Sequence, residues 1–207
     1  MSVSESTAER FELQDPDVRL MLRVRDDDAA AFEQLMLRYQ ARLIRVLEHL
    51  VGRRDLAEDL AQDVFLRIYR SRKRYVPGSK FSTWMFTIAN NVALNAKRSL
   101  SRRREVNVVD ESGAMDGRAL EQMVLAASGQ MPTRQLDRVE LCDMVRIAIG
   151  ALSERQRLAV LLSKFEHLSY AEIAEIMELT PQAIKSLLSR ARSKLKEVLE
   201  PYMNDHQ

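Results

Sequence analysis

The chain has 207 residues, of which 46% are hydrophobic and 6% aromatic, and only six are glycine. This composition supports a packed core, excludes a typical β-sandwich, and favours an all-α protein because the helix-forming residues Leu, Ala, Arg and Glu are abundant. The net charge of +2 says little about partners, but the basic residues cluster in residues 70–80, 97–104 and 185–196. The single cysteine excludes an intrachain disulfide. Because no signal-peptide pattern and no apolar run of about 20 residues is present, we expect a cytoplasmic protein without membrane insertion.

The first predicted unit covers residues 26–105, after an N-terminal extension (residues 1–25) that carries the start of the first helix. Residues 26–51 have an apolar stripe at helical spacing, and Gly52 ends that helix. Asp55 with Glu58 predicts a capping-box variant at the start of a second helix. The breaker at residues 76–79 then separates this helix from a third, over residues 82–104.

A linker and a second helical unit follow. Residues 106–136 are acidic, contain three glycines and are only weakly periodic, so we expect a flexible linker. The second unit spans residues 137–203, and within it Ser153 with Gln156 predicts another capping box. The expected fold is therefore all-α, with two small helical domains joined by a flexible linker.

The end of the second unit predicts a helix-turn-helix. Ser169 with Glu172 forms a capping box, residues 178–180 form a turn, and Thr180 caps a helix whose first residue is Pro181. One face of that last helix is polar and basic, as major-groove recognition requires. The alternative is an ordinary amphipathic hairpin with a solvated basic face.

The sequence contains no pattern of an enzyme. Its three histidines lack metal-ligand spacing, and it has no glycine-rich phosphate loop and no nucleophile elbow. We therefore predict no catalytic residue, no metal site and no cofactor.

Several short motifs together resemble a bacterial RNA polymerase sigma factor. They are Asp-Leu-Ala-Gln-Asp at 59–63, Lys-Phe-Ser-Thr-Trp at 80–84 with Ile-Ala-Asn-Asn at 88–91, Leu-Ser-Glu-Arg-Gln-Arg at 152–157, and the motifs at 169–174 and 185–192. Their order resembles the extracytoplasmic-function (ECF) class of the sigma-70 family, which keeps only the second and fourth conserved regions. The resemblance covers roughly residues 30–104 and 137–199.

The resemblance implies that Asp59, Gln62 and Asp63 bind the clamp helices of the largest subunit of core RNA polymerase. The flap of the second polymerase subunit is a further implied contact. Acidic and amide groups can bond arginines of a partner, although a solvated acidic helix face has the same pattern. An anti-sigma factor is a partner that the resemblance allows and the sequence does not show.

Promoter DNA is the other implied partner. The minus-ten element would be recognised and melted by residues around the breaker, where aromatic rings stack on bases and cations hold the strand. These residues are Tyr75, Lys80, Phe81, Ser82, Thr83, Trp84, Asn90, Asn91, Lys97 and Arg98. The alternative for Phe81 and Trp84 is a place in the core. Thr87 and Ile88 stand where housekeeping sigma factors have paired tryptophans, which suggests stringent dependence on a good promoter.

The last helix would read the minus-thirty-five element. The implied residues are Gln182, Lys185, Ser186, Ser189, Arg190 and Arg192, the last as a phosphate contact. The predicted function is a sigma factor that binds core polymerase, confers promoter recognition and promotes DNA opening. The alternatives are a helix-turn-helix regulator that does not bind core polymerase, and a helical adaptor without a DNA role.

Overall fold

The computed structural model describes residues 10, 11, 13–106 and 147–204, and in this part of the chain every regular element is a helix. The N-terminal bundle consists of α2 (Pro16–Arg25), α3 (Ala29–Val51), α4 (Arg54–Ser71), the short 3-10 helix η1 (Arg72–Arg74) and α5 (Phe81–Val106). The C-terminal unit consists of α8 (Glu154–Lys164), α9 (Tyr170–Met177) and α10 (Pro181–Asn204). The all-α prediction is confirmed. No helix of the described ranges combines the length and the apolar character needed to cross a membrane.

Helix α3 begins three residues later than the sequence predicted. The side chain of Asp28 accepts a hydrogen bond from the N–H of Ala31 at 3.0 Å, so Asp28 is the N-cap. Asp27 before it has a φ of 69°, which helical residues do not adopt. Residues 26–28 therefore form the turn between α2 and α3. The predicted end is confirmed, because Gly52 adopts the left-handed conformation with a φ of 75°.

The predicted capping box at the start of α4 is wrong. The N-cap is Arg53, and its side chain makes no capping hydrogen bond. Asp55 pairs with Arg53, and Glu58 accepts from Arg54 at 3.0 Å. The two carboxylates bind arginine side chains in place of backbone N–H groups, which local spacing alone does not reveal.

The segment before residue 26 contains a complete helix. In α2, Val18, Met21 and Val24 are fully buried against the rest of the bundle. Asp15 caps α2, since its Oδ1 accepts the N–H of Asp17 at 2.9 Å. Its Oδ2 accepts the N–H of Phe81 at 3.0 Å, so the same carboxylate also caps the start of α5.

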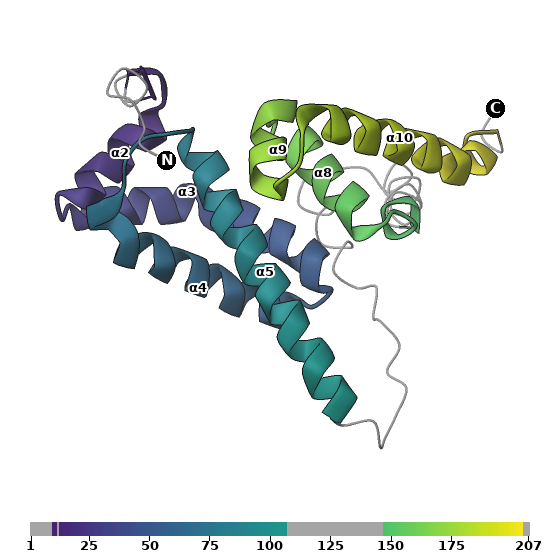
Figure 1. Ribbon diagram of the computed structural model, residues 1–207, viewed down its shortest axis with the longest axis horizontal. Coiled ribbons are helices and arrows are strands. Elements are labelled where there is room, and N and C mark those ends of the chain that lie inside the picture. Colours follow the sequence, from purple (N-terminus) through teal and green to yellow (C-terminus); the bar gives the residue numbers. More distant parts are fainter. Residues whose placement is uncertain (1–9, 12, 107–146, 205–207) are drawn as a thin grey trace, which may run out of the picture.

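The C-terminal unit has the local structure that the sequence predicted. The capping boxes of Ser153 with Gln156 and of Ser169 with Glu172 are both complete. Glu178 ends α9 in the left-handed conformation, and the N–H of Ala183 donates to Thr180 at 3.2 Å at the start of α10. The helix-turn-helix is therefore formed by α9, the turn and α10 (Figure 1).

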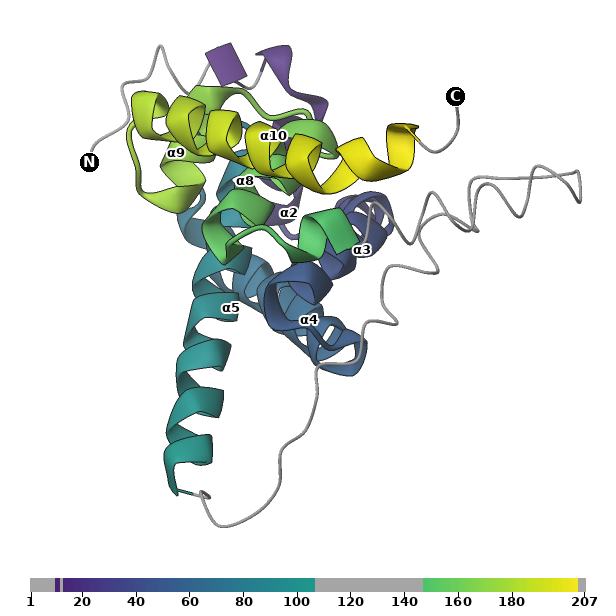
Figure 2. The same ribbon diagram turned by 90° about the vertical axis from the view of Figure 1, so that its right-hand side faces the viewer.

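The two units pack against each other. In both views α9 lies beside the first half of α5, and α8 lies beside α3, while the second half of α5 extends beyond the other helices (Figures 1 and 2). The predicted linker, apart from residue 106 at the end of α5, lies outside the described residues.

Candidate nucleic-acid interfaces

The recognition helix α10 presents all of its predicted DNA-binding residues to solvent. Ile184, Leu188 and Ala191 form the buried stripe that fixes the helix on α8 and α9. The opposite face is exposed and contains Gln182, Lys185, Ser186, Ser189, Arg190 and Arg192.

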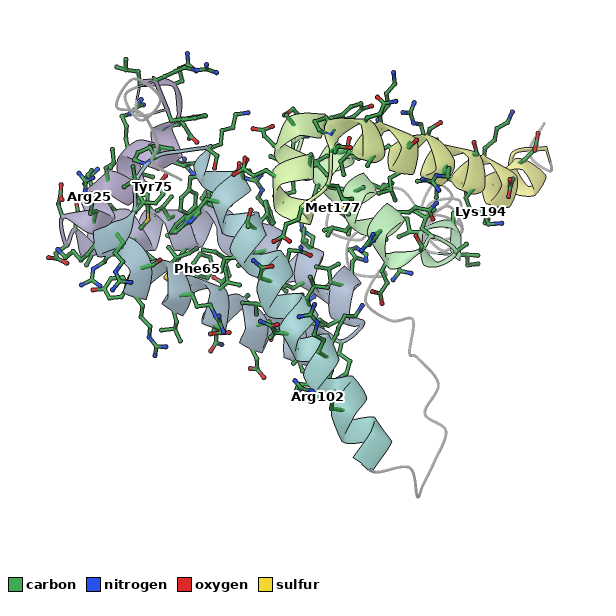
Figure 3. All side chains as sticks on the ribbon, in the orientation of Figure 1. Arg25, Phe65, Tyr75, Arg102, Met177 and Lys194 are labelled. Atoms are coloured by element: carbon green, nitrogen blue, oxygen red, sulfur yellow. The ribbon has the colours of Figure 1, made fainter. Side chains whose placement is uncertain are left out.

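Within the described residues, no ion pair involves the arginines on the exposed face of α10. There, Arg190 and Arg192 donate to carbonyls of their own helix, at 3.4 and 3.3 Å. Lys194, labelled in Figure 3, pairs with Glu197 at 3.1 Å farther along the helix. The first three turns of α10 therefore present cations and hydrogen-bonding groups that a phosphate or a base edge can engage.

The predicted aromatic platform of the N-terminal bundle lies mostly in the core. Tyr75 and Phe81 are 4% and 0% exposed, and their ring centroids lie 4.8 and 6.1 Å from that of Trp84. Phe81 also packs edge-on against Tyr39 at 5.2 Å. Thr83 is fully buried as well. In this arrangement Tyr75, Phe81 and Thr83 have no side-chain face open to solvent, whereas Trp84 is partly exposed.

The reason for this burial is the packing of α2 and α3 around the start of α5, which the sequence did not reveal. Figure 3 shows Tyr75 pointing inward from the segment before α5. Burial raises the pKa of the Tyr75 hydroxyl, and the charge of Asp15 adds to this effect. Full burial of a large apolar side chain such as Phe81 contributes roughly 1.5–3 kcal/mol. These rings therefore hold the start of α5 in place.

The remaining predicted minus-ten residues lie at the surface of α5 or immediately before it. Ser82, Asn90, Lys97 and Arg98 are partly exposed, and Lys80 and Asn91 are exposed. Three of these six side chains contact the C-terminal unit. Lys80 pairs with Glu172 at 2.9 Å, the amide of Asn90 donates to the carbonyl of Ile176 at 3.2 Å, and Lys97 pairs with Glu154.

The basic residues after α4 have a structural role that the sequence did not predict. Arg72 binds Asp27 at 3.1 Å, and Lys73 pairs with the same carboxylate. Hydrogen bonds from Lys73, then from Arg72, lower the pKa of Asp27. These two cations thus fasten η1 to the turn between α2 and α3.

The acidic face of α4 lies beside an apolar groove. Asp59 and Gln62 are exposed, whereas Asp63 is partly buried and accepts from Arg67 at 3.0 Å. The groove between α3 and α4 has a volume of about 790 Å³ and includes Gln62, Leu66 and other side chains of both helices. Its lining residues are Ala29, Phe32, Met36, Gln40, Ile44, Arg54, Glu58, Ala61, Gln62, Phe65, Leu66 and Tyr69.

The sequence analysis did not predict this groove, although the positions of two apolar residues of α4 indicate it. The core stripe of α4 repeats every four residues, and Leu66 and Tyr69 lie off that stripe. Leu66 is 51% exposed, while the ring of Tyr69 lies 5.1 Å from that of Phe32. Phe65, labelled in Figure 3, lies deeper, between the two helices. Apolar side chains beside free polar groups are typical of a protein-binding surface.

No candidate metal centre is present in the described residues, where no three His, Cys, Asp or Glu side chains are grouped to hold an ion.

Two family models match the chain, one for each unit. Sigma-70 region 2 matches residues 35–103, and sigma-70 region 4 matches residues 142–195. The chain belongs to the sigma-70 family of RNA polymerase sigma factors. The candidate residues of α4 and α5 fall in the first match, and those of α10 fall in the second.

Curated relatives place this sigma factor in the ECF class. It is 31% identical to the RNA polymerase sigma-H factor of Pseudomonas aeruginosa, over 93% of this chain and 98% of the relative. It is also 31% identical to the ECF sigma-E factor of Haemophilus influenzae, over 90% and 97% of the two chains. The predicted class and function are confirmed, and the regulator alternative is not favoured.

Solved structures agree with this assignment. Sigma factor RpoE of Bartonella quintana, solved with the anti-sigma factor NepR, has a TM-score of 0.63 and 29% identity, covering 82% of this chain and 96% of that one. CnrH, solved with the cytosolic domain of CnrY, has a TM-score of 0.62 and covers 90% and 99% of the chains. At 21% identity, CnrH supports the fold alone.

Proposed function

We propose that this sigma factor divides promoter initiation among three surfaces: the α3–α4 groove with its acidic rim, the start of α5, and the exposed face of α10. The observation that carries this proposal is that two family regions occur in one chain, each with an exposed, chemically suitable surface. The factor binds core RNA polymerase, brings it to paired promoter elements, helps to open the start site and is then released. The chain has no catalytic activity of its own and acts in the cytoplasm with the polymerase.

The polymerase contact is assigned to the rim and floor of the groove. Asp59 and Gln62 provide exposed acceptors for arginines of the clamp helices in the largest subunit, and Leu66 provides apolar contact area. Asp63 takes part more weakly, because Arg67 already binds its carboxylate. The C-terminal unit contacts the flap of the second subunit.

The minus-thirty-five element is assigned to α10. Its first turns carry Gln182, Lys185 and Ser186, which lie where a helix-turn-helix presents residues to base edges. Ser189 and Arg190 continue the same exposed face, and Arg192 binds a phosphate. A well-placed bidentate base contact contributes about 1–3 kcal/mol of discrimination.

The minus-ten element is assigned to the surface residues around the start of α5. Trp84 provides the partly exposed ring, and the polar and cationic contacts come from Lys80, Ser82, Asn90, Asn91, Lys97 and Arg98. Tyr75, Phe81 and Thr83 support this surface from beneath. An anti-sigma factor is proposed as a further partner, because the RpoE structure contains one.

The test is run-off transcription with purified core polymerase, this chain and a library of promoters, without any other factor. We expect transcripts only when both factor and core are present, from promoters that share two spaced elements. A chain that binds duplex DNA but never supports transcription with core polymerase would be a regulator, and the proposal would be wrong.

A further inference from the structure

A buried hydrogen bond between Tyr39 and Asp17 joins α3 to the first turn of α2. The hydroxyl of Tyr39 donates to Oδ2 of Asp17 at 2.6 Å, and Nη1 of Arg38 binds the other oxygen, Oδ1. Asp17 and Tyr39 are only 8% and 3% exposed. Burial, and then the bond to Asp17, raise the pKa of the Tyr39 hydroxyl, so it keeps its proton and remains a donor. A hydrogen bond to a charged acceptor is stronger than a neutral one, and burial shields it from water.

Tyr39 transmits this constraint to the start of α5. Its ring lies edge-on to that of Phe81, the first residue of α5, with 5.2 Å between the ring centroids. Phe81 is fully buried, and its own ring centroid lies 6.1 Å from that of Trp84. Close-packed rings have little room to turn, so a shift of one displaces the next. These contacts therefore connect the carboxylate of Asp17 to the partly exposed ring of Trp84.

The aromatic cluster around Trp84 has two buried hydroxyls, and they differ in how they are held. The ring of Tyr75 lies 4.8 Å from that of Trp84, but its buried hydroxyl has no hydrogen-bond partner among the described residues. The hydroxyl of Tyr39 is bound to Asp17. Packing alone therefore holds Tyr75, whereas Tyr39 is fixed by a directional bond as well.

We propose that Asp17 and Tyr39 are positioning residues for promoter opening. Through Phe81, their hydrogen bond sets the orientation in which the ring of Trp84 stacks on a base of the minus-ten element. The inference rests on the proposed role of Trp84. Both side chains are too buried to touch DNA, neither lines the α3–α4 groove, and Asp17 precedes the matched residues 35–103 of sigma-70 region 2. Loss of the bond therefore spares polymerase binding and slows strand separation, where the orientation of the stacking ring matters.

The test uses Tyr39→Phe, which removes the hydroxyl and keeps the ring. Tyr170→Phe on α9 is the matched control, since it removes a hydroxyl from a side chain that is 39% exposed. Holoenzyme assembled from core polymerase and the full-length chain is given a duplex promoter chosen with the wild-type factor. It is also given the same promoter with mismatches that keep the strands apart from the minus-ten element to the start site. Closed-complex affinity and the rate of open-complex formation are measured separately.

The free chain supplies a spectroscopic reading of the same change. Trp84 is the only tryptophan in the sequence, so its near-ultraviolet circular dichroism and its fluorescence report the setting of this one ring. Far-ultraviolet circular dichroism shows whether the helices are intact.

We expect Tyr39→Phe to slow open-complex formation about fivefold on the duplex promoter, with a closed-complex affinity within about twofold of the wild type. Transcription from the mismatched promoter should return to the wild-type level, because the slow step is bypassed. The near-ultraviolet signal of Trp84 should change with the helix content intact, and Tyr170→Phe should match the wild type throughout. Opening at the wild-type rate, an equal loss on the mismatched promoter, or an unchanged Trp84 signal would each overturn the proposal.

A second variant breaks the bond from its other end and covers the case in which Tyr39→Phe fails to fold. Asp17→Ala should also slow opening, and the double variant should open no more slowly than Asp17→Ala alone, because both changes remove one contact. Additive losses would overturn the proposal.

Trp84→Ala separates this result from the proposed function. If Trp84→Ala opens the promoter at the wild-type rate, the proposed minus-ten role of Trp84 is wrong, and the inference is wrong with it. If Trp84→Ala opens slowly and Tyr39→Phe does not, only the positioning role is wrong.

Discussion

Asp15 is expected to hold the start of α5 in place from a distance of 66 residues along the chain. Its two carboxylate oxygens accept one backbone N–H each, from Asp17 in α2 and from Phe81 in α5. Lys80 directly precedes Phe81, and Trp84 lies three residues after it; both are proposed minus-ten contacts. We therefore predict that Asp15→Ala loosens the first turn of α5 as well as the start of α2.

The magnitude follows from the two lost caps. Replacing a capping Asp by Ala costs typically about 1 kcal/mol, so Asp15→Ala should lower the free energy of unfolding by roughly 2 kcal/mol. For a chain of this size that corresponds to a fall in melting temperature of roughly 4–8 °C. Asn has a single acceptor oxygen, so Asp15→Asn should keep one of the two caps and lose about half as much stability as Asp15→Ala.

The assay is thermal unfolding followed by circular dichroism, together with run-off transcription. Asp15→Ala should melt earlier and transcribe poorly from promoters that need assisted melting, while its binding to core polymerase stays intact. If Asp15→Ala were as stable as the wild type, or if Asp15→Asn were equally damaged, the double-cap explanation would be wrong.

Three further changes test other parts of the molecule. Arg190→Ala should weaken use of the minus-thirty-five element at least tenfold in run-off assays, while core binding is kept. The control Lys196→Ala, which lies farther along α10, should have little effect. Equal losses in the two variants would contradict base reading by Arg190. Asp59→Arg should reduce pull-down of core polymerase without unfolding the chain, and the exposed control Glu200→Arg should not; unchanged pull-down would remove Asp59 from the contact. Burial, together with two nearby arginines, lowers the pKa of His49 from 6.5 to about 4. Between these two pH values the unfolded chain binds more protons than the folded chain, so the free energy of unfolding falls as the pH drops through this range. The loss should reach about 2 kcal/mol at about pH 5, and His49→Gln should remove this part of the pH dependence in urea unfolding measured at both ends of the window.

Local sequence patterns were reliable wherever the stabilising contact lies within a few residues. The capping boxes at Ser153 and Ser169, the left-handed Gly52 and the cap at Thr180 all join groups separated by at most four residues. Periodicity also identified the buried stripe of α10, and with it the exposed face. The predicted capping box at the start of α4 was wrong for a related reason. Asp55 has the right spacing for a cap, but an arginine side chain binds its carboxylate instead.

The sequence by itself determined the helical class, the helix-turn-helix and the family, because each depends on spacing along one helix or on short motifs in a set order. Only the tertiary structure decided that Asp15 caps α5, that Tyr75 and Phe81 lie in the core, and that Glu166 binds Arg42. Those contacts join residues up to 124 positions apart. Their partners are selected by how whole helices pack, which is a property of the assembled core and not of any single segment.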